Sequence, residues 1–205
     1  MPVEFIHRFL PGKSPVTLLT LHGTGGDEND LLQVGQVLVP GAAILSPRGK
    51  AVENGAFRFF SQITPDVFDE NEIRTRAGEL AEWIASAIAQ YGLDASRLYA
   101  LGYSNGANMA AATMLLHPGS IAGGVLLRPM NVIRPATLPD LSNAPVLIVA
   151  GQEDAFTPLS RTEALGRLLA EAGAAVDFSV QNTGHELTPQ DFGLGKKWFA
   201  EVVSV

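Results

Sequence analysis

Short apolar runs alternate with stretches of helical periodicity along most of the chain. Six continuous apolar runs predict strands that are covered on both faces, as in a parallel sheet. These runs span residues 16–23, 42–47, 97–104, 122–129, 144–151 and 174–181. Because these runs alternate with helical segments along the chain, the pattern predicts an α/β fold with a mostly parallel sheet and helices on both faces.

Five segments carry the helical pattern. The longest places Ile73, Leu80 and Trp83 near one face and stops at Gly92, a residue that favours helix ends. Another begins at Asp27, whose carboxylate suits the positive end of a helix. The predicted helices are residues 27–39, 72–91, 105–116, 159–172 and 189–203.

Two connections are longer than the others. Residues 48–71 are rich in Phe and show no regular pattern, and residues 128–144 contain several prolines. Long connections in a compact domain often carry function.

Composition narrows the class of protein. The chain has 205 residues, of which 46% are hydrophobic, so we expect residues 1–205 to form a single domain. A net charge of −7 without a basic run predicts no binding to nucleic acid or to anionic membranes. The chain lacks both an apolar run of roughly 20 residues and a signal-peptide pattern, so we expect a cytoplasmic protein. The absence of cysteine excludes disulfides, thiolate metal sites and a cysteine nucleophile.

The most informative stretch is Gly102-Tyr103-Ser104-Asn105-Gly106, which follows a predicted strand and precedes a helix of small residues. That context is typical of a nucleophile elbow, a turn too sharp for a Cβ two residues before or after the serine. The helix dipole and the N–H of Asn105 would then face an oxyanion formed at Ser104. An ordinary strand–helix turn is the alternative.

A serine nucleophile needs a base, and the chain has four histidines. His185 follows the last predicted strand and is late enough to complete the chain order serine, acid, histidine. His7 falls in the N-terminal strand region, His22 follows the first predicted strand, and His117 ends a helix. The alternative for His185 is a surface loop residue.

The acid should follow the strand that ends near residue 151, where Glu153 and Asp154 come next. We prefer Asp154, because the loop has then cleared the sheet edge and Pro158 fixes the chain after it. Glu153 stays open as the orienter of the imidazole, and either acid could instead cap the next helix. Asp140 lies in a proline-rich loop and Asp177 inside a strand, so both are poorer candidates.

Residues 22–27 supply glycines after the first predicted strand, and these let the backbone approach a substrate oxygen. The N–H of Thr24 can pair with that of Asn105 in an oxyanion hole. A nucleotide-phosphate loop does not fit, because Glu28 takes the place of the last glycine in G-x-G-x-x-G. The nearby acids, up to Asp30, lack the spacing of an EF-hand, so we expect no metal site.

The chain resembles the phospholipase/carboxylesterase family of α/β-hydrolases, which includes the acyl-protein thioesterases. LHGTGGDEND, SPRG, ENGAFRFF, GYSNGANMA, LLRPM, AGQEDAFTP and GHELTPQD carry the resemblance over nearly the whole length. Residues 48–60 and LLRPM are similar to the bacterial carboxylesterase branch linked to hydroquinone and quinone stress. The elbow departs from the thioesterase branch, which usually has Gln where this chain has Asn105.

The resemblance implies an α/β-hydrolase fold with a catalytic triad of Ser104, Asp154 and His185. It also implies an oxyanion hole formed by the N–H groups of Thr24 and Asn105. No metal or organic cofactor is implied. Relatives are often dimers, so a homodimer stays open, although no apolar stripe in the sequence compels one.

Residues 128–144 occupy the usual site of a lid insertion but are too few for a helical cap domain. We therefore expect an open, shallow pocket for small, short-acyl esters. Candidates for its apolar rim are Phe57, Phe60, Met130 and Phe156, with core packing as the alternative that we favour for Phe59. Arg48 and Arg128 follow strand ends and either point at the site or pair with acids such as Glu53.

These features predict a serine carboxylesterase that acts on a small-molecule ester through an acyl-enzyme on Ser104. A thioesterase or a C–C hydrolase would use the same triad. The alternative from another class is a hydrolase-fold binding protein that no longer turns over. All three triad positions are filled, which favours the enzyme.

Overall fold

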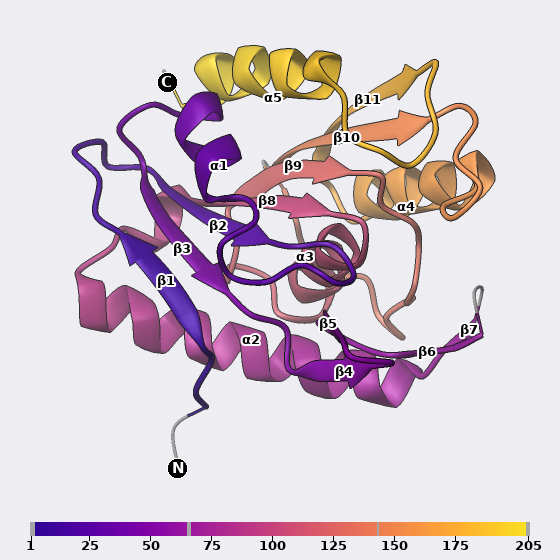
Figure 1. The fold of residues 1–205 in the computed structure, drawn as a ribbon, viewed down its shortest axis with the longest axis horizontal. Coiled ribbons are helices and arrows are strands. Elements are labelled where there is room, and N and C mark those ends of the chain that lie inside the picture. The colour runs from indigo at the N-terminus through magenta and orange to yellow at the C-terminus, as the bar shows by residue number, and fades with distance from the viewer. Residues whose placement is uncertain (1–2, 65–66, 143, 204–205) are drawn as a thin grey trace.

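The computed structural model describes residues 3–64, 67–142 and 144–203. A seven-stranded sheet forms its centre (Figure 1). From one edge to the other, its strands are β1 (His7–Leu10), β3 (Ala43–Pro47), β2 (Thr17–Leu21), β8 (Leu98–Tyr103), β9 (Gly123–Leu127), β10 (Pro145–Gly151) and β11 (Ala175–Gln181). Every neighbouring pair is parallel except β1 with β3. The predicted α/β fold with a mostly parallel sheet is therefore confirmed.

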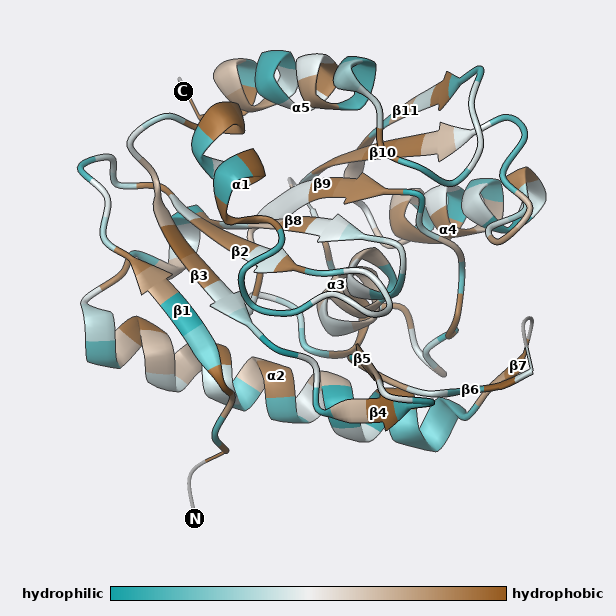
Figure 2. Ribbon diagram, viewed as in Figure 1, coloured by the Kyte–Doolittle hydropathy of each residue, from teal (hydrophilic) through white to brown (hydrophobic). Residues whose placement is uncertain are grey.

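Helices cover both faces of the sheet (Figure 1). One face carries α2 (Glu70–Tyr91), α3 (Asn105–Leu116) and α4 (Leu159–Glu171), and the other carries α1 (Leu32–Leu38) and α5 (Pro189–Val202). A short 3-10 helix, Ala95–Arg97, precedes β8. The helices alternate between hydrophobic and hydrophilic segments (Figure 2), as helices that pack one side on a sheet do.

Each face of the sheet has its own apolar cluster. Trp83 of α2 and Leu168 of α4 belong to the first cluster. Leu38 of α1 and Phe199 of α5 belong to the second. Burial on both faces explains why the central strands read as continuous apolar runs rather than as alternating ones.

The first helix is shorter than predicted, because it begins at Leu32 and not at Asp27. The Asp27 carboxylate accepts the N–H of Asn29 at 2.8 Å, which stabilises a turn instead of a helix start. Glu28, in the same turn, forms an ion pair with Arg48. Local side-chain bonds therefore outcompete the helix over this first turn.

Residues 48–71 contain regular structure that the apolar pattern did not predict. They form two small antiparallel pairs, β4 (Ala51–Glu53) with β5 (Ala56–Arg58) and β6 (Gln62–Thr64) with β7 (Val67–Phe68). Residues 65 and 66 of this connection lie outside the described ranges. Asn54 and Gly55 join β4 to β5 with φ of 51° and 81°, the conformation that Asn-Gly hairpins adopt.

The other long connection carries no helix or strand in its described residues, 128–142 and 144. Accordingly, it forms no helical cap there above the carboxyl ends of the strands. Within the described ranges, no helix combines the length and apolar character needed to cross a bilayer.

Candidate active site

Ser104 lies at a sharp turn between β8 and α3. Its backbone has φ 51° and ψ −117°, a conformation that residues with a side chain rarely adopt. A Cβ on Gly102 would come within 2.6 Å of the Ala107 Cα, and one on Gly106 within 2.1 Å of the Leu21 carbonyl oxygen. The turn therefore leaves no room for a side chain at either glycine, as predicted.

His185 lies between β11 and α5, next to the serine in space. Its Nε2 is 2.9 Å from Ser104 Oγ, and its Nδ1 is 2.7 Å from Asp154 Oδ2. Because a carboxylate can only accept, Nδ1 carries the proton and Nε2 is free to accept from the serine hydroxyl. The structure thus brings His185 together with Ser104, 81 positions before it in the chain, and with Asp154, 31 positions before it.

Asp154 follows β10 and is 7% exposed. Its Oδ1 accepts the N–H groups of Phe156 at 2.8 Å and Thr157 at 2.9 Å, and its Oδ2 also accepts the Thr157 hydroxyl. Burial alone would raise the pKa of Asp154, but hydrogen bonds from Thr157 and His185 outweigh it and lower the pKa. Glu153, the alternative acid, is exposed, and its backbone N–H donates to the Thr183 carbonyl oxygen at 3.0 Å.

Arg128 braces the loop that carries His185. Its side chain is fully buried and donates to the carbonyl oxygens on either side of the histidine, Gly184 at 3.1 Å and Glu186 at 3.1 Å. Two further bonds, at 3.0 and 2.8 Å, join its guanidinium to both carboxylate oxygens of Asp191. This answers the question left open by the sequence, because Arg128 pairs with an acid and does not point into the site.

Asp191 ties the same brace to α5. Its carboxylate accepts the N–H of Thr188 at 2.7 Å, which completes a capping box at the helix start. The predicted helix start at residue 189 is confirmed, and the capping-box spacing of Thr188 and Asp191 is a sequence signal that agrees with it. The ion pair with Arg128 has no such local signal.

Thr24 and Asn105 both line the space in front of Ser104. As the first residue of α3, Asn105 has no acceptor one helical turn back for its N–H. In the glycine loop, the N–H of Gly25 donates to Phe57 and that of Gly26 to Gly23, while the N–H of Thr24 has no acceptor among the described residues. Both predicted donors are therefore available to a ligand.

His22 fixes the shape of the glycine loop through both of its ring nitrogens. Its ring is 1% exposed, its Nδ1 lies 2.7 Å from the Gly23 carbonyl oxygen, and its Nε2 accepts the Gly49 N–H at 2.9 Å. Burial lowers the pKa of His22, although the Gly23 carbonyl and nearby acids oppose the shift. A neutral ring that donates from Nδ1 satisfies both contacts.

A pocket of about 390 Å³ opens in front of Ser104. Of the predicted residues, Thr24, Ser104, Asn105, Met130, Phe156 and His185 line it. Sequence reasoning missed the other polar residues and aromatic rings of its wall, which are Arg58, Gln62, Phe68, Tyr103, Asn108 and Thr157. Phe156 is 71% exposed at the rim, with its ring centroid 5.2 Å from that of His185.

Phe57 and Phe60 do not line this pocket, contrary to prediction. Phe60 is fully buried in the core, like Phe59, which is 2% exposed. The Asn105 side chain binds the backbone of both, accepting the Phe59 N–H at 2.7 Å and donating to the Phe60 carbonyl oxygen at 3.1 Å. Successive side chains of β5 point to opposite sides, so Arg58 reaches the pocket where Phe57 does not.

Arg48 stays outside the pocket as well. Its Nη2 donates to Glu28 at 2.8 Å, and its guanidinium carbon lies 4.6 Å from the centre of the Phe57 ring. The hydrogen bond from Arg48 lowers the pKa of Glu28. In the described part of the chain, no group of three or more His, Asp or Glu side chains is placed to hold a metal ion.

The chain is similar to known proteins over nearly its whole length. The family model described as phospholipase/carboxylesterase matches residues 12–201. The putative hydrolase MhqD of Bacillus subtilis (strain 168) is 38% identical over 197 residues, which is 96% of this chain and 98% of the relative. The crystal structure of the Bacillus cereus carboxylesterase superposes with a TM-score of 0.93 at 37% identity, covering 96% of this chain and 94% of that one.

A carboxylesterase from Mesorhizobium loti gives a TM-score of 0.91 at 34% identity, with 96% of this chain and 94% of that chain covered. A match of this extent leaves little of the chain outside the shared fold. The chain therefore belongs to the phospholipase/carboxylesterase family, with the α/β-hydrolase fold, and is an ester hydrolase.

Proposed function

We propose that the chain is a serine carboxylesterase in which Ser104 is the nucleophile, His185 the general base and Asp154 the residue that orients the base. The observation that carries the proposal is the continuous hydrogen-bonded line from Ser104 through His185 to Asp154, with steps of 2.9 and 2.7 Å, at the wall of a pocket. This arrangement has the geometry that activates a serine hydroxyl, which is otherwise a poor nucleophile near neutral pH.

The reaction then proceeds in two halves. His185 takes the proton from Ser104 as the oxygen attacks the ester carbonyl, and Asp154 stabilises the charged imidazole that results. His185 returns this proton to the alcohol as the ester C–O bond breaks, which leaves an acyl group on Ser104. A water molecule that gives its proton to His185 attacks the acyl group. The bond between the acyl carbon and Ser104 Oγ then breaks, His185 returns the proton to Ser104, and the carboxylic acid is released.

The N–H groups of Thr24 and Asn105 stabilise the negative oxygen of each tetrahedral intermediate. Support comes from their place in the pocket wall and from the N–H of Thr24, which has no acceptor among the described residues. Each such donor contributes roughly 3 kcal/mol to transition-state stabilisation. His22 and Gly49 hold the glycine loop in position for this role.

The size of the pocket supports small, short-acyl esters as substrates. Its volume of about 390 Å³ lies near the lower end of the roughly 300–1,000 Å³ typical of small-molecule sites. Met130 and Phe156 contribute to its apolar surface together with Phe68, and the described residues of 128–144 form no helix above it. A long acyl chain would have to extend past Phe156 into water.

Hydrolysis of p-nitrophenyl esters from acetate to decanoate tests this proposal, with Ser104→Ala measured in parallel. We expect activity that declines with acyl length, and a kcat that falls by about 10⁴-fold or more in the variant. A folded Ser104→Ala protein that keeps full activity would overturn the assignment. An ester and a thioester with the same acyl group, compared on the wild-type protein, test the thioesterase alternative.

A further inference from the structure

The pocket wall contains an arginine that has no partner of opposite charge among the described residues of the pocket. Arg58 contributes to this wall, and no Asp or Glu side chain of the described residues does. Arg58 as a whole is only 7% exposed, so its guanidinium is largely removed from bulk water. An arginine stays charged in such a place, because its pKa is too high for burial to neutralise it.

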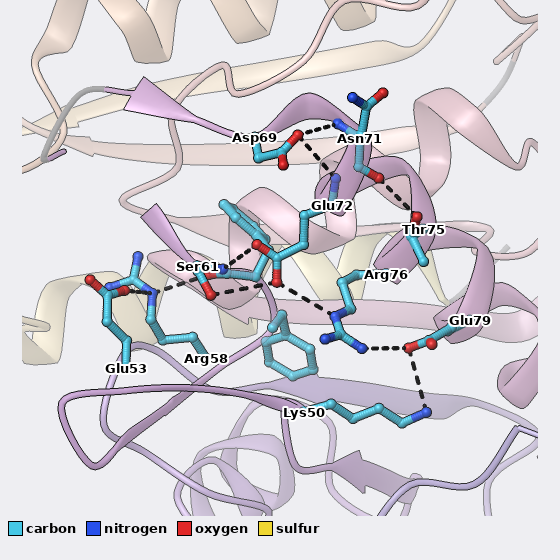
Figure 3. A network of polar contacts seen from close by, with 12 residues as sticks. Lys50, Glu53, Arg58, Ser61, Asp69, Asn71, Glu72, Thr75, Arg76 and Glu79 are labelled. Carbon is cyan, nitrogen blue, oxygen red and sulfur yellow. Dashed lines mark hydrogen bonds and ion pairs between the residues drawn. The ribbon is translucent and has the colours of Figure 1, made fainter. Parts of the chain in front are cut away.

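The described residues satisfy this guanidinium through its Nε and Nη2. Its Nε donates to the Phe60 carbonyl oxygen at 3.1 Å and lies 3.4 Å from a carboxylate oxygen of Glu53 (Figure 3), and its Nη2 donates to Gln62 Oε1 at 2.8 Å. Its Nη1 has no acceptor among the described residues. Glu53 does not line the pocket, so it leaves the pocket side of the guanidinium for another acceptor.

Two amide groups add donors to the same wall. Gln62 uses its oxygen to accept from Arg58, and its NH₂ group has no acceptor among the described residues. Asn108 uses its oxygen to accept the Met130 N–H at 2.7 Å, and its NH₂ group likewise has no acceptor within the described ranges. We call Arg58, Gln62 and Asn108 the donor wall, because each presents hydrogen-bond donors to the pocket.

The donor wall is held rigidly with respect to Ser104. The Phe60 carbonyl oxygen accepts from Arg58 Nε and from Asn105 Nδ2, both at 3.1 Å, so one atom links the wall to the residue after the serine. The segment after β5 is also tied to α2, where Ser61 N–H donates to Glu72 at 3.2 Å (Figure 3). A wall fixed in this way binds its ligand without a large cost in side-chain entropy.

We propose that the donor wall binds a carboxylate, so that the preferred substrates are esters that carry a free carboxylate a few bonds from the scissile ester. This rests on the proposed function at Ser104. A guanidinium flanked by amide NH₂ groups matches the acceptor oxygens of a carboxylate, which an apolar acyl chain lacks. A substrate with an apolar group at this place would displace water and leave the donors unpaired. Sites built to hydrogen-bond a polar group strongly reject substrates that lack it.

Matched ester pairs test the proposal, because each pair replaces the carboxylate by an acetyl group of similar shape. Monoethyl succinate and ethyl levulinate place the group on the acyl side, and acetoxyacetate and acetoxyacetone place it on the alcohol side. We expect kcat/KM to favour the anionic member of at least one pair by about 10- to 100-fold. The two pairs show on which side of the ester the wall acts.

Arg58→Gln should reduce this ratio to near one, and Arg58→Lys, which keeps the charge without the planar fork, should give an intermediate ratio. Arg48→Gln is the matched control, because it removes the same charge from the same connection outside the pocket and should keep the wild-type ratio. A ratio cancels any loss of folded protein that a variant causes. Equal kcat/KM within both pairs of the wild-type protein, or a ratio that survives Arg58→Gln, would overturn the proposal.

Calorimetry on the Ser104→Ala protein separates this inference from the proposed function. We expect an anionic ester to bind at least about tenfold more tightly than its neutral partner, and Arg58→Gln in the same background to remove the difference. Equal binding of both members would overturn the donor wall, whatever the activity. Turnover by Ser104→Ala itself would instead contradict the proposed function.

Discussion

Two buried arginines belong to the candidate active site, Arg58 in the pocket wall and Arg128 behind the loop that carries His185, and their surroundings differ. Arg128 is 0% exposed, and its guanidinium reaches both oxygens of Asp191 and three backbone carbonyls, among them those that flank His185. Arg58 has a single carboxylate at 3.4 Å and an Nη1 without an acceptor in the described part of the chain.

The difference separates a brace from a recognition group. A guanidinium whose donors are all used by the protein has nothing left for a ligand, so Arg128 can act on the reaction only by holding the His185 loop. Arg58 keeps donors for a ligand, and these unpaired donors lower the stability of the ligand-free protein. Changes on the Arg128 side should thus affect all esters alike, whereas changes at Arg58 should affect the choice among them.

The largest effect is expected at Asp154, which contacts the His185 that Arg128 holds in place. Asp154→Asn removes the acceptor that keeps the proton on His185 Nδ1, so kcat should fall by about 10³- to 10⁴-fold for anionic and neutral esters alike. Glu153→Gln is the control, because the Glu153 side chain is exposed and outside the pocket, and its kcat should match the wild type. Steady-state kinetics of both variants checks this, and a large loss in Glu153→Gln would reverse the choice of acid.

Next in size is the stability lost when the brace is broken. Arg128→Met leaves the Asp191 carboxylate buried without its partner and should cost about 3–5 kcal/mol in the free energy of unfolding. The double variant Arg128→Met/Asp191→Leu should recover part of that loss, since no charge stays buried. Urea denaturation measures both.

Arg134→Gln serves as the control for the brace, because Arg134 pairs with Glu171 where both side chains are more than half exposed. It should shift the denaturation midpoint little. A similar shift in Arg128→Met and Arg134→Gln would contradict the role given to the brace.

The lowered pKa of Asp154 gives a smaller effect with a defined sign. A carboxyl whose pKa is lower in the folded than in the unfolded state contributes stability above its unfolded value of about 3.9, and this stability is lost as the pH falls through the folded value. Thr157→Val removes a donor to Asp154, so the pKa of Asp154 should rise and unfolding in acid should begin at a higher pH.

Circular dichroism during acid titration measures this change, and at neutral pH the variant should lose about 1–3 kcal/mol of stability. Thr137→Val, at an exposed position in the connection after β9, controls for the substitution itself. An acid transition of Thr157→Val at a lower pH than in the wild type would contradict the assigned sign.

The smallest effect is expected at the rim. Phe156→Ala removes a ring that is 71% exposed and lies near His185, so the unfolding free energy should change by less than about 0.5 kcal/mol. KM for a hexanoate ester should rise a few-fold, while the ratio within the anionic and neutral pairs stays as in the wild type. A changed ratio would mean that selectivity does not lie in the donor wall alone.

The fold could be predicted because its signals are local. Apolar runs mark the strands, and the central ones are buried on both faces as predicted. The run at residues 174–181 is a correction, because it forms the edge strand β11, which is largely exposed. The glycines around Ser104 mark a turn without room for a Cβ. The late start of the first helix, at Leu32 instead of Asp27, and the hairpin at Asn54-Gly55 escaped the hydrophobic pattern, because side-chain bonds and turn chemistry decide them. The Asn-Gly pair itself was a readable signal.

The pocket wall was harder to predict, because non-local contacts decide which side chains face it. Side chains alternate along β5, so Arg58 lines the pocket where Phe57 was expected to do so. This alternation cannot be used until residues 56–58 are known to form a strand. The Arg128–Asp191 pair joins residues 63 positions apart, and nothing in the local sequence selects Asp191 over other acids.

Covalent labelling of the protein with a fluorophosphonate, followed by intact-mass and peptide mass spectrometry, tests the central claim most directly. The account predicts one adduct per chain, located on Ser104, with loss of esterase activity in proportion to labelling. The adduct should form far more slowly in Asp154→Asn and at the normal rate in Glu153→Gln. Full esterase activity in the labelled protein, or an adduct on another residue that accounts for the loss, would contradict the account.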